Sequence, residues 1–237
     1  MNCLMSREGM IPRNYQFLIS AVILVILTQG CGLNNYPYIK APTVRALNGS
    51  SGVFSIFNRD DNDPDIFQGY ELYYKFYDAA NSQALRETDY NSLFSVEEPE
   101  PADIIKLGFK RINTVSTINQ RTPYPMIPID YSDRDNYFEI KIDFSAVDYS
   151  INQVIPKVSY LSNDLISLFR VVIDPDHIDS YKSFIVDDLS IIDTDISSVP
   201  VTLSLFVFSY GKYDRVYNIY SKPVWLGYID YDYIEAP

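Results

Sequence analysis

The chain has very few of the residues on which most catalytic and metal sites depend. Its 237 residues include one histidine, His177, and two cysteines, Cys3 and Cys31. A single histidine excludes every metal site that needs two histidine ligands. The nine glycines form neither phosphate-binding pattern, G-x-x-x-x-G-K-[ST] or G-x-G-x-x-G, and no G-x-S-x-G nucleophile elbow occurs. We therefore expect a protein without a cofactor, a metal ion or catalytic activity.

Basic residues are in the minority. The 19 lysines and arginines are outnumbered by 31 aspartates and glutamates, which gives a net charge of −12. Such an acidic surface repels the phosphate backbone of nucleic acids and excludes them as partners. It also repels anionic lipid headgroups, so that any membrane attachment must be hydrophobic. The remaining composition, 47% hydrophobic and 15% aromatic, is that of a globular domain rich in half-buried strands.

The N-terminal apolar run Phe17–Leu27 is too short to span a bilayer, which takes about 20 residues. Its length fits the apolar region of a secretory signal. Arg13 precedes the run, and the small residue Gly30 lies directly before Cys31. This order of features predicts a cleaved export signal.

Residues 27–31, Leu-Thr-Gln-Gly-Cys, resemble the lipobox of bacterial lipoproteins in the loose form typical of spirochaetes. The resemblance implies that Cys31 receives a diacylglyceryl thioether. It further implies that residues 1–30 are then cleaved and that the new N-terminus is acylated. Two or more chains give stable anchoring, whereas a single chain is marginal. The expected location is the bacterial cell envelope, attached to the inner or the outer membrane. A plain secretory signal and an N-terminal core helix are the alternatives to a lipoprotein signal.

The same region suggests where the folded body begins. Translation from Met10 would give a more compact leader, so we expect the true start there. Residues 31–41 comprise the lipidated cysteine and a polar stretch, expected to be a tether of at most ~35 Å. The folded body then comprises residues 42–237 and has no thiol for an internal disulfide. Its stability must come from a hydrophobic core.

Beyond the tether, strand patterns dominate. Apolar residues alternate over 70–77, 137–144 and 201–208, which predicts strands with one face on a core. Shorter strands are expected at 53–57 and 222–229. The residues expected to face the core are Tyr70, Leu72, Tyr74, Phe76, Phe138, Ile140, Ile142, Phe144, Val201, Leu203, Leu205 and Val207.

Other elements are less regular. A first strand is expected near 43–47, followed by a turn at 48–52. Residues 79–91 fit a short helix, and residues 161–172 fit either a helical turn that runs into a strand or a buried strand. Prolines mark long connections at positions 99, 101, 123, 125 and 128.

The order of these features resembles a fibronectin type III or immunoglobulin-like domain. "GVFSIFN" is similar to the second strand of that family, and "GYELYY" to the third. "LSLFVFSYG" and "YSKPVWL" are similar to the last two strands, with Gly211 at their hairpin. The resemblance implies a mainly β, antiparallel β-sandwich in which residues 78–198 form a large insertion. A second β-sandwich or an unrelated β-rich fold are the alternatives.

Two polar clusters are candidate sites. In "NRDDNDPD" (58–65) Asp61, Asp63 and Asp65 alternate, and clustered carboxylates suit calcium, although the EF-hand spacing is missing. The alternative is a solvated turn. His177 lies among Asp174, Asp176 and Asp179, where it could act as a general base or belong to a polar turn. Neither cluster has the pattern of a complete site, so we assign no metal or catalytic residue.

Aromatic residues are concentrated near the C-terminus. They are Tyr220, Trp225, Tyr228, Tyr231 and Tyr233. Exposed aromatics can recognise glycans or proteins, although most strand aromatics are packed.

The sequence therefore predicts a non-enzymatic lipoprotein that is anchored to the membrane through Cys31. We expect it to contact a protein partner through loops or a sheet edge, or to be a structural module. The alternative is a lipoprotein that binds a solute or glycan in a pocket built by residues 78–198. An aromatic-lined cavity would favour the alternative.

Overall fold

The computed structural model describes residues 37–45, 52–78, 80–114, 125–145, 147–148, 153–154, 156–161, 166–174, 177–182 and 201–231. Residues Tyr38–Pro237 form one compact unit. Met10, the predicted signal peptide 1–30 and Cys31 lie outside the described residues. None of the helices in the described part is long and apolar enough to cross a membrane.

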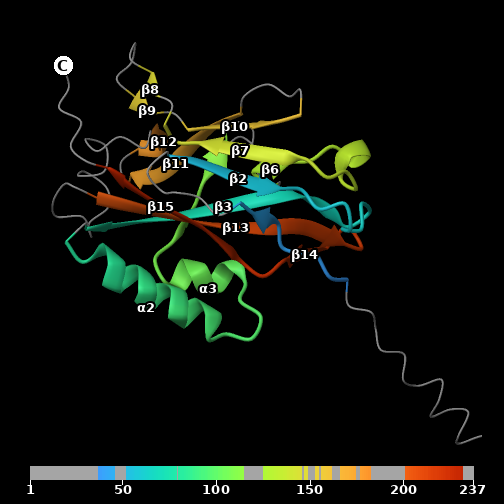
Figure 1. Ribbon diagram of the computed structural model, residues 1–237, viewed down its shortest axis with the longest axis horizontal. Helices are drawn as coiled ribbons and strands as arrows, with labels where there is room; N and C mark the ends of the chain where they lie inside the picture. Colours follow the sequence, from blue (N-terminus) through green and yellow to red (C-terminus); the bar gives the residue numbers. More distant parts are fainter. Residues whose placement is uncertain are drawn as a thin grey trace, which may run out of the picture. The chain divides into compact units, whose positions relative to one another are not determined.

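The fold is mainly β, and the described strand pairs are antiparallel, as the alternating patterns predict (Figure 1). In the first sheet the strand order is β1 (Thr43–Val44), β2 (Val53–Phe57), β7 (Glu139–Asp143), β10 (Lys157–Tyr160), β11 (Ile166–Asp174) and β12 (His177–Lys182), with β5 (Asn113–Thr114) paired to β11. A separate hairpin joins β8 (Val147–Asp148) to β9 (Gln153–Val154).

The second sheet is built around two long strands, β3 (Phe67–Asp78) and β13 (Val201–Tyr213). On the outer side of β13 lie β14 (Tyr217–Tyr220) and β15 (Val224–Tyr231). On the outer side of β3 lie β4 (Lys110–Arg111) and β6 (Ile127–Pro128).

The main core lies between the two sheets. Every core residue that the alternation predicts is buried there, apart from Val201, whose side chain lies outside the described residues. The strands expected at 53–57 and 222–229 are confirmed as β2 and β15. β7, β10 and β11, which come from the segment 78–198, pair in the same sheet as β2. That segment therefore supplies part of the sandwich itself.

A third layer covers the outer face of the second sheet. It consists of α2 (Ser82–Phe94), which confirms the expected helix, and α3 (Pro101–Lys106) (Figure 1). Tyr73, Tyr77, Phe206 and Phe208 face this layer and are buried with Leu93 and Ile104 in a second core. The central strands of this sheet are therefore buried on both faces, one against the first sheet and one against the helices.

The helix α3 begins where the sequence predicted only a connection. Pro101 lies in its first turn, where the fixed φ of proline suits a helix and no N–H is lost. Glu100 and Asp103 form a capping box, in which the Glu100 N–H donates to Asp103 Oδ2 at 3.1 Å. A proline followed by an acidic N3 residue is the signal that the prediction missed.

The prediction that Gly211 forms the last hairpin is wrong. Gly211 lies inside β13, opposite Ile219, and the turn follows at Asp214 and Arg215, which have φ of 51° and 57°. A Cβ at position 211 would collide with Ile39 Cδ1 and with the carbonyl oxygen of Ile66. Glycine is therefore needed for close packing of the N-terminal segment.

Candidate functional site

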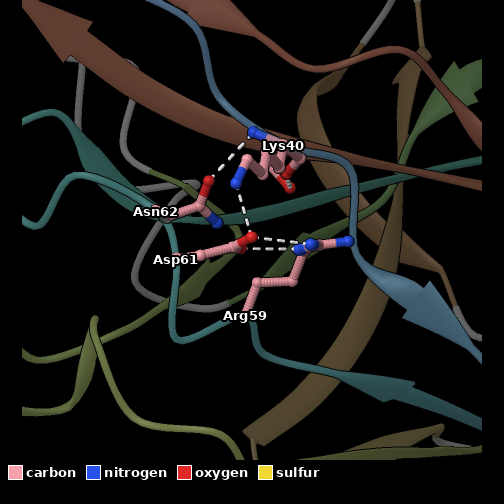
Figure 2. Close-up of polar contacts among 5 residues, drawn as sticks. Lys40, Arg59, Asp61 and Asn62 are labelled. Carbon is pink, nitrogen blue, oxygen red and sulfur yellow. Dashed lines mark hydrogen bonds and ion pairs between the residues drawn. The ribbon is translucent and has the colours of Figure 1, made fainter.

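In the acidic loop 58–65, the carboxylates of Asp61, Asp63 and Asp65 each accept hydrogen bonds from different groups of the chain itself. Asp61 accepts hydrogen bonds from Lys40 Nζ at 2.5 Å and from Arg59 Nε and Nη2, each at 2.7 Å (Figure 2). Asp63 accepts one from the Asp65 N–H, and Asp65 accepts one from the Tyr131 hydroxyl. Within the described residues, no group of three or more acidic, histidine or cysteine side chains could hold a metal ion. The described carboxylates of the loop therefore do not converge on one point where they could bind calcium.

This loop holds the N-terminal segment of the body. The Lys40 N–H donates to Asn62 Oδ1 at 2.9 Å (Figure 2). The Lys40 carbonyl accepts a hydrogen bond from Ser209 Oγ at 2.7 Å. Ile39 is only 1% exposed and belongs to the main core. Residues 38–41, which were expected to be tether, are therefore part of the folded unit. Arg59 and Lys40 hold the pKa of the Asp61 carboxyl well below its usual range.

The described residues do not test the candidate cluster around His177. His177 is the first residue of β12, opposite Asp174 in β11. The side chains of both residues lie outside the described part, as does Asp176.

A groove lies between α2 and the strand β15. Its volume is about 630 Å³, and half of the residues that line it are aromatic, with a second, more polar hollow of about 730 Å³ adjoining it. The two hollows share Gln83, Arg86, Glu87 and Tyr228. We call this continuous site the α2–β15 groove. Its volume is in the range of small-molecule binding sites.

A β-bulge in β15 aims two aromatic side chains into the groove. Trp225 lies opposite Phe206 and Gly227 opposite Leu205, so that Leu226 is an extra residue in the ladder. Leu226 is buried in the main core, whereas Trp225 and Tyr228 line the groove. Bulges of this kind re-aim side chains and are frequent beside functional sites.

The aromatic rings of the groove come from both elements. Trp225 and Tyr228 have nearly parallel planes, 15° apart, with centroids separated by 6.4 Å. From α2, Tyr90 meets the Trp225 ring edge to face at 6.1 Å and packs on Phe94 at 4.5 Å. Trp225 is 39% exposed and Tyr90 is 41% exposed. The rings therefore pack the helix onto the sheet while they keep accessible surface.

Polar side chains border these rings. The Arg86 guanidinium lies 3.7 Å from the centroid of the Tyr228 ring, and its Nε donates to the Ser82 carbonyl. Gln83 Nε2 donates to Glu87 Oε1 at 3.1 Å. Trp225 Nε1 donates to Ser204 Oγ at 3.1 Å, which fixes the orientation of the indole.

A partly buried ion pair fixes α2 on the sheet. Lys75 Nζ on β3 lies 2.6 Å from Asp89 Oδ2 on α2 and also donates to the Leu107 carbonyl. The Tyr77 hydroxyl donates to the same carboxylate oxygen at 2.8 Å, and burial together with Asp89 raises the pKa of Tyr77. The helix that carries Arg86 and Tyr90 is thereby held in place.

The carboxylate of Glu71, on β3, is buried. Glu71 is 2% exposed and accepts hydrogen bonds from Arg111 Nη2 and from the Tyr73 hydroxyl, each at 2.9 Å. Burial raises the pKa of Glu71, and the Arg111 charge opposes this shift. A perturbed carboxyl can mark a catalytic site. Here one oxygen pairs with Arg111 of β4 and the other with Tyr73 of the same strand, so that Glu71 has a structural role.

The aromatic residues that the sequence singled out are only partly brought together. Trp225 and Tyr228 meet in the groove, whereas Tyr220 packs against Phe208 and Tyr210. The side chain of Tyr231 and all of Tyr233 lie outside the described residues. The contribution of α2 was missed. Its signal was the pair Tyr90 and Phe94, four residues apart on the helix.

No protein-family model, curated protein or solved structure matches the chain. The function is therefore inferred from the residues of the chain itself.

Proposed function

We propose that the chain is a lipid-anchored lipoprotein of the bacterial cell envelope that binds a ligand in the α2–β15 groove and catalyses no reaction. The observation that carries the proposal is the groove itself. Half-exposed rings from two elements line a hollow of ligand size, and polar side chains lie at its margin. Binding sites commonly combine aromatic walls with a few polar groups in this way.

The N-terminal sequence supports the anchor. The lipobox-like residues 27–31 would place lipid on Cys31, seven positions before Tyr38, the first residue of the compact unit. The N-terminal segment joins the body at Ser209 on β13, while Thr202, Ser204 and Phe206 of the same strand line the groove. At 3.3 Å per residue, these three residues lie about 10 to 23 Å along the strand from Ser209.

The strand order supports the resemblance to fibronectin type III and immunoglobulin-like sandwiches. In the constant immunoglobulin type, the first, second and fifth strands share one sheet, and the third, sixth and seventh share the other. Here β1, β2 and β7 are neighbours in one sheet, and β3, β13 and β15 are neighbours in the other. On this proposal, most of the residues that have no counterpart in an immunoglobulin-like sandwich fall into two segments. One is 79–109, with the helices, and the other is 145–200, with β8 to β12.

A protein partner is the second candidate. Among the described residues β15 pairs with β13 alone. An extended peptide could add to such an edge and place side chains in the groove.

Fatty-acid labelling tests the anchor. Cells that express the wild-type chain should incorporate a fatty-acid analogue into it, and the Cys31→Ser variant should take up none. Equal labelling of the two proteins would refute the anchor.

A thermal-shift screen tests the binding function. The purified chain is heated with sugars, metal ions, metabolites and short peptides, because a ligand that binds only the folded state raises the melting temperature. We expect at least one compound to raise it by several degrees in the wild type and not in Tyr90→Ala. Equal shifts in both proteins, or none in either, would contradict the proposal.

A further inference from the structure

We propose that the ligand of the α2–β15 groove is a neutral oligosaccharide, one sugar of which packs on the ring of Trp225. This inference rests on the proposed function of the groove as a binding site. It names the chemical class of the ligand.

The exposed rings suit the apolar face of a sugar. A pyranose ring presents C–H groups on its face, and these pack on an aromatic ring when both surfaces leave water. Trp225 is 39% exposed, and its indole is held by the hydrogen bond to Ser204 and by the Tyr90 ring. A ring that is already fixed loses little conformational freedom when a ligand packs on it.

The margin of the groove suits the hydroxyl groups of a sugar. Gln83, Glu87 and Asn91 come from α2, and Asp230 comes from β15. Amides both donate and accept hydrogen bonds, and carboxylates accept them, which matches hydroxyl groups that do both. A peptide side chain that is purely apolar would leave these groups without new partners on binding.

Charge favours a neutral ligand over an anionic one. Among the described residues that line the groove, Arg86 is the single cationic one, and it is accompanied by Glu87 and Asp230. The chain as a whole carries a net charge of −12, which repels anions. Arg86 also stacks on Tyr228, so that Trp225 offers the better platform for a sugar.

The length of the groove favours several sugar units over one. Its two hollows, of about 630 and 730 Å³, adjoin through shared residues and run from Trp225 toward Asp230. Each is large enough for a small ligand. A chain of sugars would follow the groove from one hollow to the other.

Trp225 is the only tryptophan of the chain, so its fluorescence reports on this site alone. The detergent-solubilised full chain is titrated with triacetylchitotriose, maltotetraose and cellotetraose. A sulfated tetrasaccharide and a mixture of short peptides form the other arms. We expect a saturable blue shift with a neutral oligosaccharide and none with the sulfated sugar. The acetylated and unacetylated sugars distinguish a cell-wall type of glycan from a hexose polymer.

Variants assign the response to the groove. Tyr90→Ala and Gln83→Ala should weaken binding by several-fold to about tenfold, the cost of one ring contact or hydrogen bond. Tyr217→Ala, an exposed ring on β14, is the matched control and should bind as the wild type does. Far-ultraviolet circular dichroism verifies that each variant is folded.

The outcomes separate this inference from the proposed function. A fluorescence change with peptides alone overturns the inference that the ligand is an oligosaccharide, but it supports the proposal that the groove is a binding site. A change with the sulfated sugar alone overturns the neutral class. No change with any probe, together with a thermal shift by another compound that Tyr90→Ala abolishes, overturns the inference and supports the function. No change and no thermal shift overturn both.

Discussion

The Tyr70 hydroxyl donates a hydrogen bond to Asn58 Oδ1 at 2.6 Å, and both residues are completely buried. The Asn58 amide nitrogen in turn donates to the carbonyls of Asp133, Arg134 and Asn136. One side chain thus joins the loop after β2, the strand β3 and the segment before β7. Tyr70 fixes the orientation of the Asn58 amide by occupying its oxygen.

Removing the Tyr70 hydroxyl should destabilise the fold. In Tyr70→Phe the buried Asn58 oxygen loses its partner, which costs about 1–3 kcal/mol. Asn58→Ala should cost more, because it leaves three backbone carbonyls with one donor fewer. Urea denaturation of each variant measures the loss. Tyr131→Phe, at an exposed hydroxyl, is the control and should change stability little. Equal stability of Tyr70→Phe and the wild type would contradict this role.

Glu71 should make the fold less stable as the pH rises. Burial raises its folded pKa above the ordinary value of 4.5, so the folded state binds the proton more tightly than the unfolded state. Its stabilising contribution is present below pH 4.5 and is lost as the pH rises through the folded pKa. We expect Glu71→Gln to remove this decline in urea denaturation measured across that window. Glu87→Gln, at an exposed position of α2, should retain it. Parallel pH profiles for Glu71→Gln and the wild type would rule out this role of Glu71.

Asp61 should make the fold less stable as the pH falls, and this effect should occur at lower pH than that of Glu71. Arg59 and Lys40 hold its folded pKa below the ordinary value of 3.8. The stability it contributes is therefore present above pH 3.8 and is lost as the pH falls through the folded pKa. At neutral pH we expect Asp61→Asn to cost less than about 1 kcal/mol, because these ion pairs are exposed and screened by water. The main effect should be local, namely faster amide hydrogen exchange in residues 38–41. Asp60→Asn is the control, and unchanged exchange in Asp61→Asn would contradict the proposed hold on this segment.

Gly211→Ala should loosen residues 38–41 at their contact with β13. The added Cβ would meet Ile39 and the Ile66 carbonyl, both of which must shift. Overpacking of this kind costs about 1–3 kcal/mol. Lys212→Ala, the next position of β13, is the matched control. Thermal denaturation should show a lower midpoint for Gly211→Ala than for Lys212→Ala, and the reverse order would count against this packing.

The sequence predicted the sandwich core well because period-two alternation reports directly which face of a strand is buried. Tyr70, Leu72, Tyr74 and Phe76 all lie in the main core, as expected. The pattern did not predict that Tyr73 and Tyr77, on the opposite face, are buried under helices. Tyrosine suits both water and protein interior, so its presence did not distinguish an exposed face from a covered one.

The groove was harder to predict than the core, because it depends on long-range packing. Trp225 and Tyr228 are three positions apart and would lie on opposite faces of a regular strand. A bulge at Leu226 brings them together, and no local pattern announces it. Arg86 and Tyr90 join them only after α2 packs on a strand more than a hundred residues away in sequence. The acidic loop was singled out correctly as a polar cluster, but its carboxylates accept hydrogen bonds from side chains and a backbone N–H of the protein itself.

Hydrogen–deuterium exchange tests the central claim, that the α2–β15 groove is the binding site, most directly. The full chain is compared with and without the compound that raises its melting temperature most in the thermal-shift screen. We predict slower exchange in residues 82–94 and 224–231, with the Trp225→Ala variant showing none of this protection. Protection confined to other strands or loops, or equal protection in Trp225→Ala, would contradict the account.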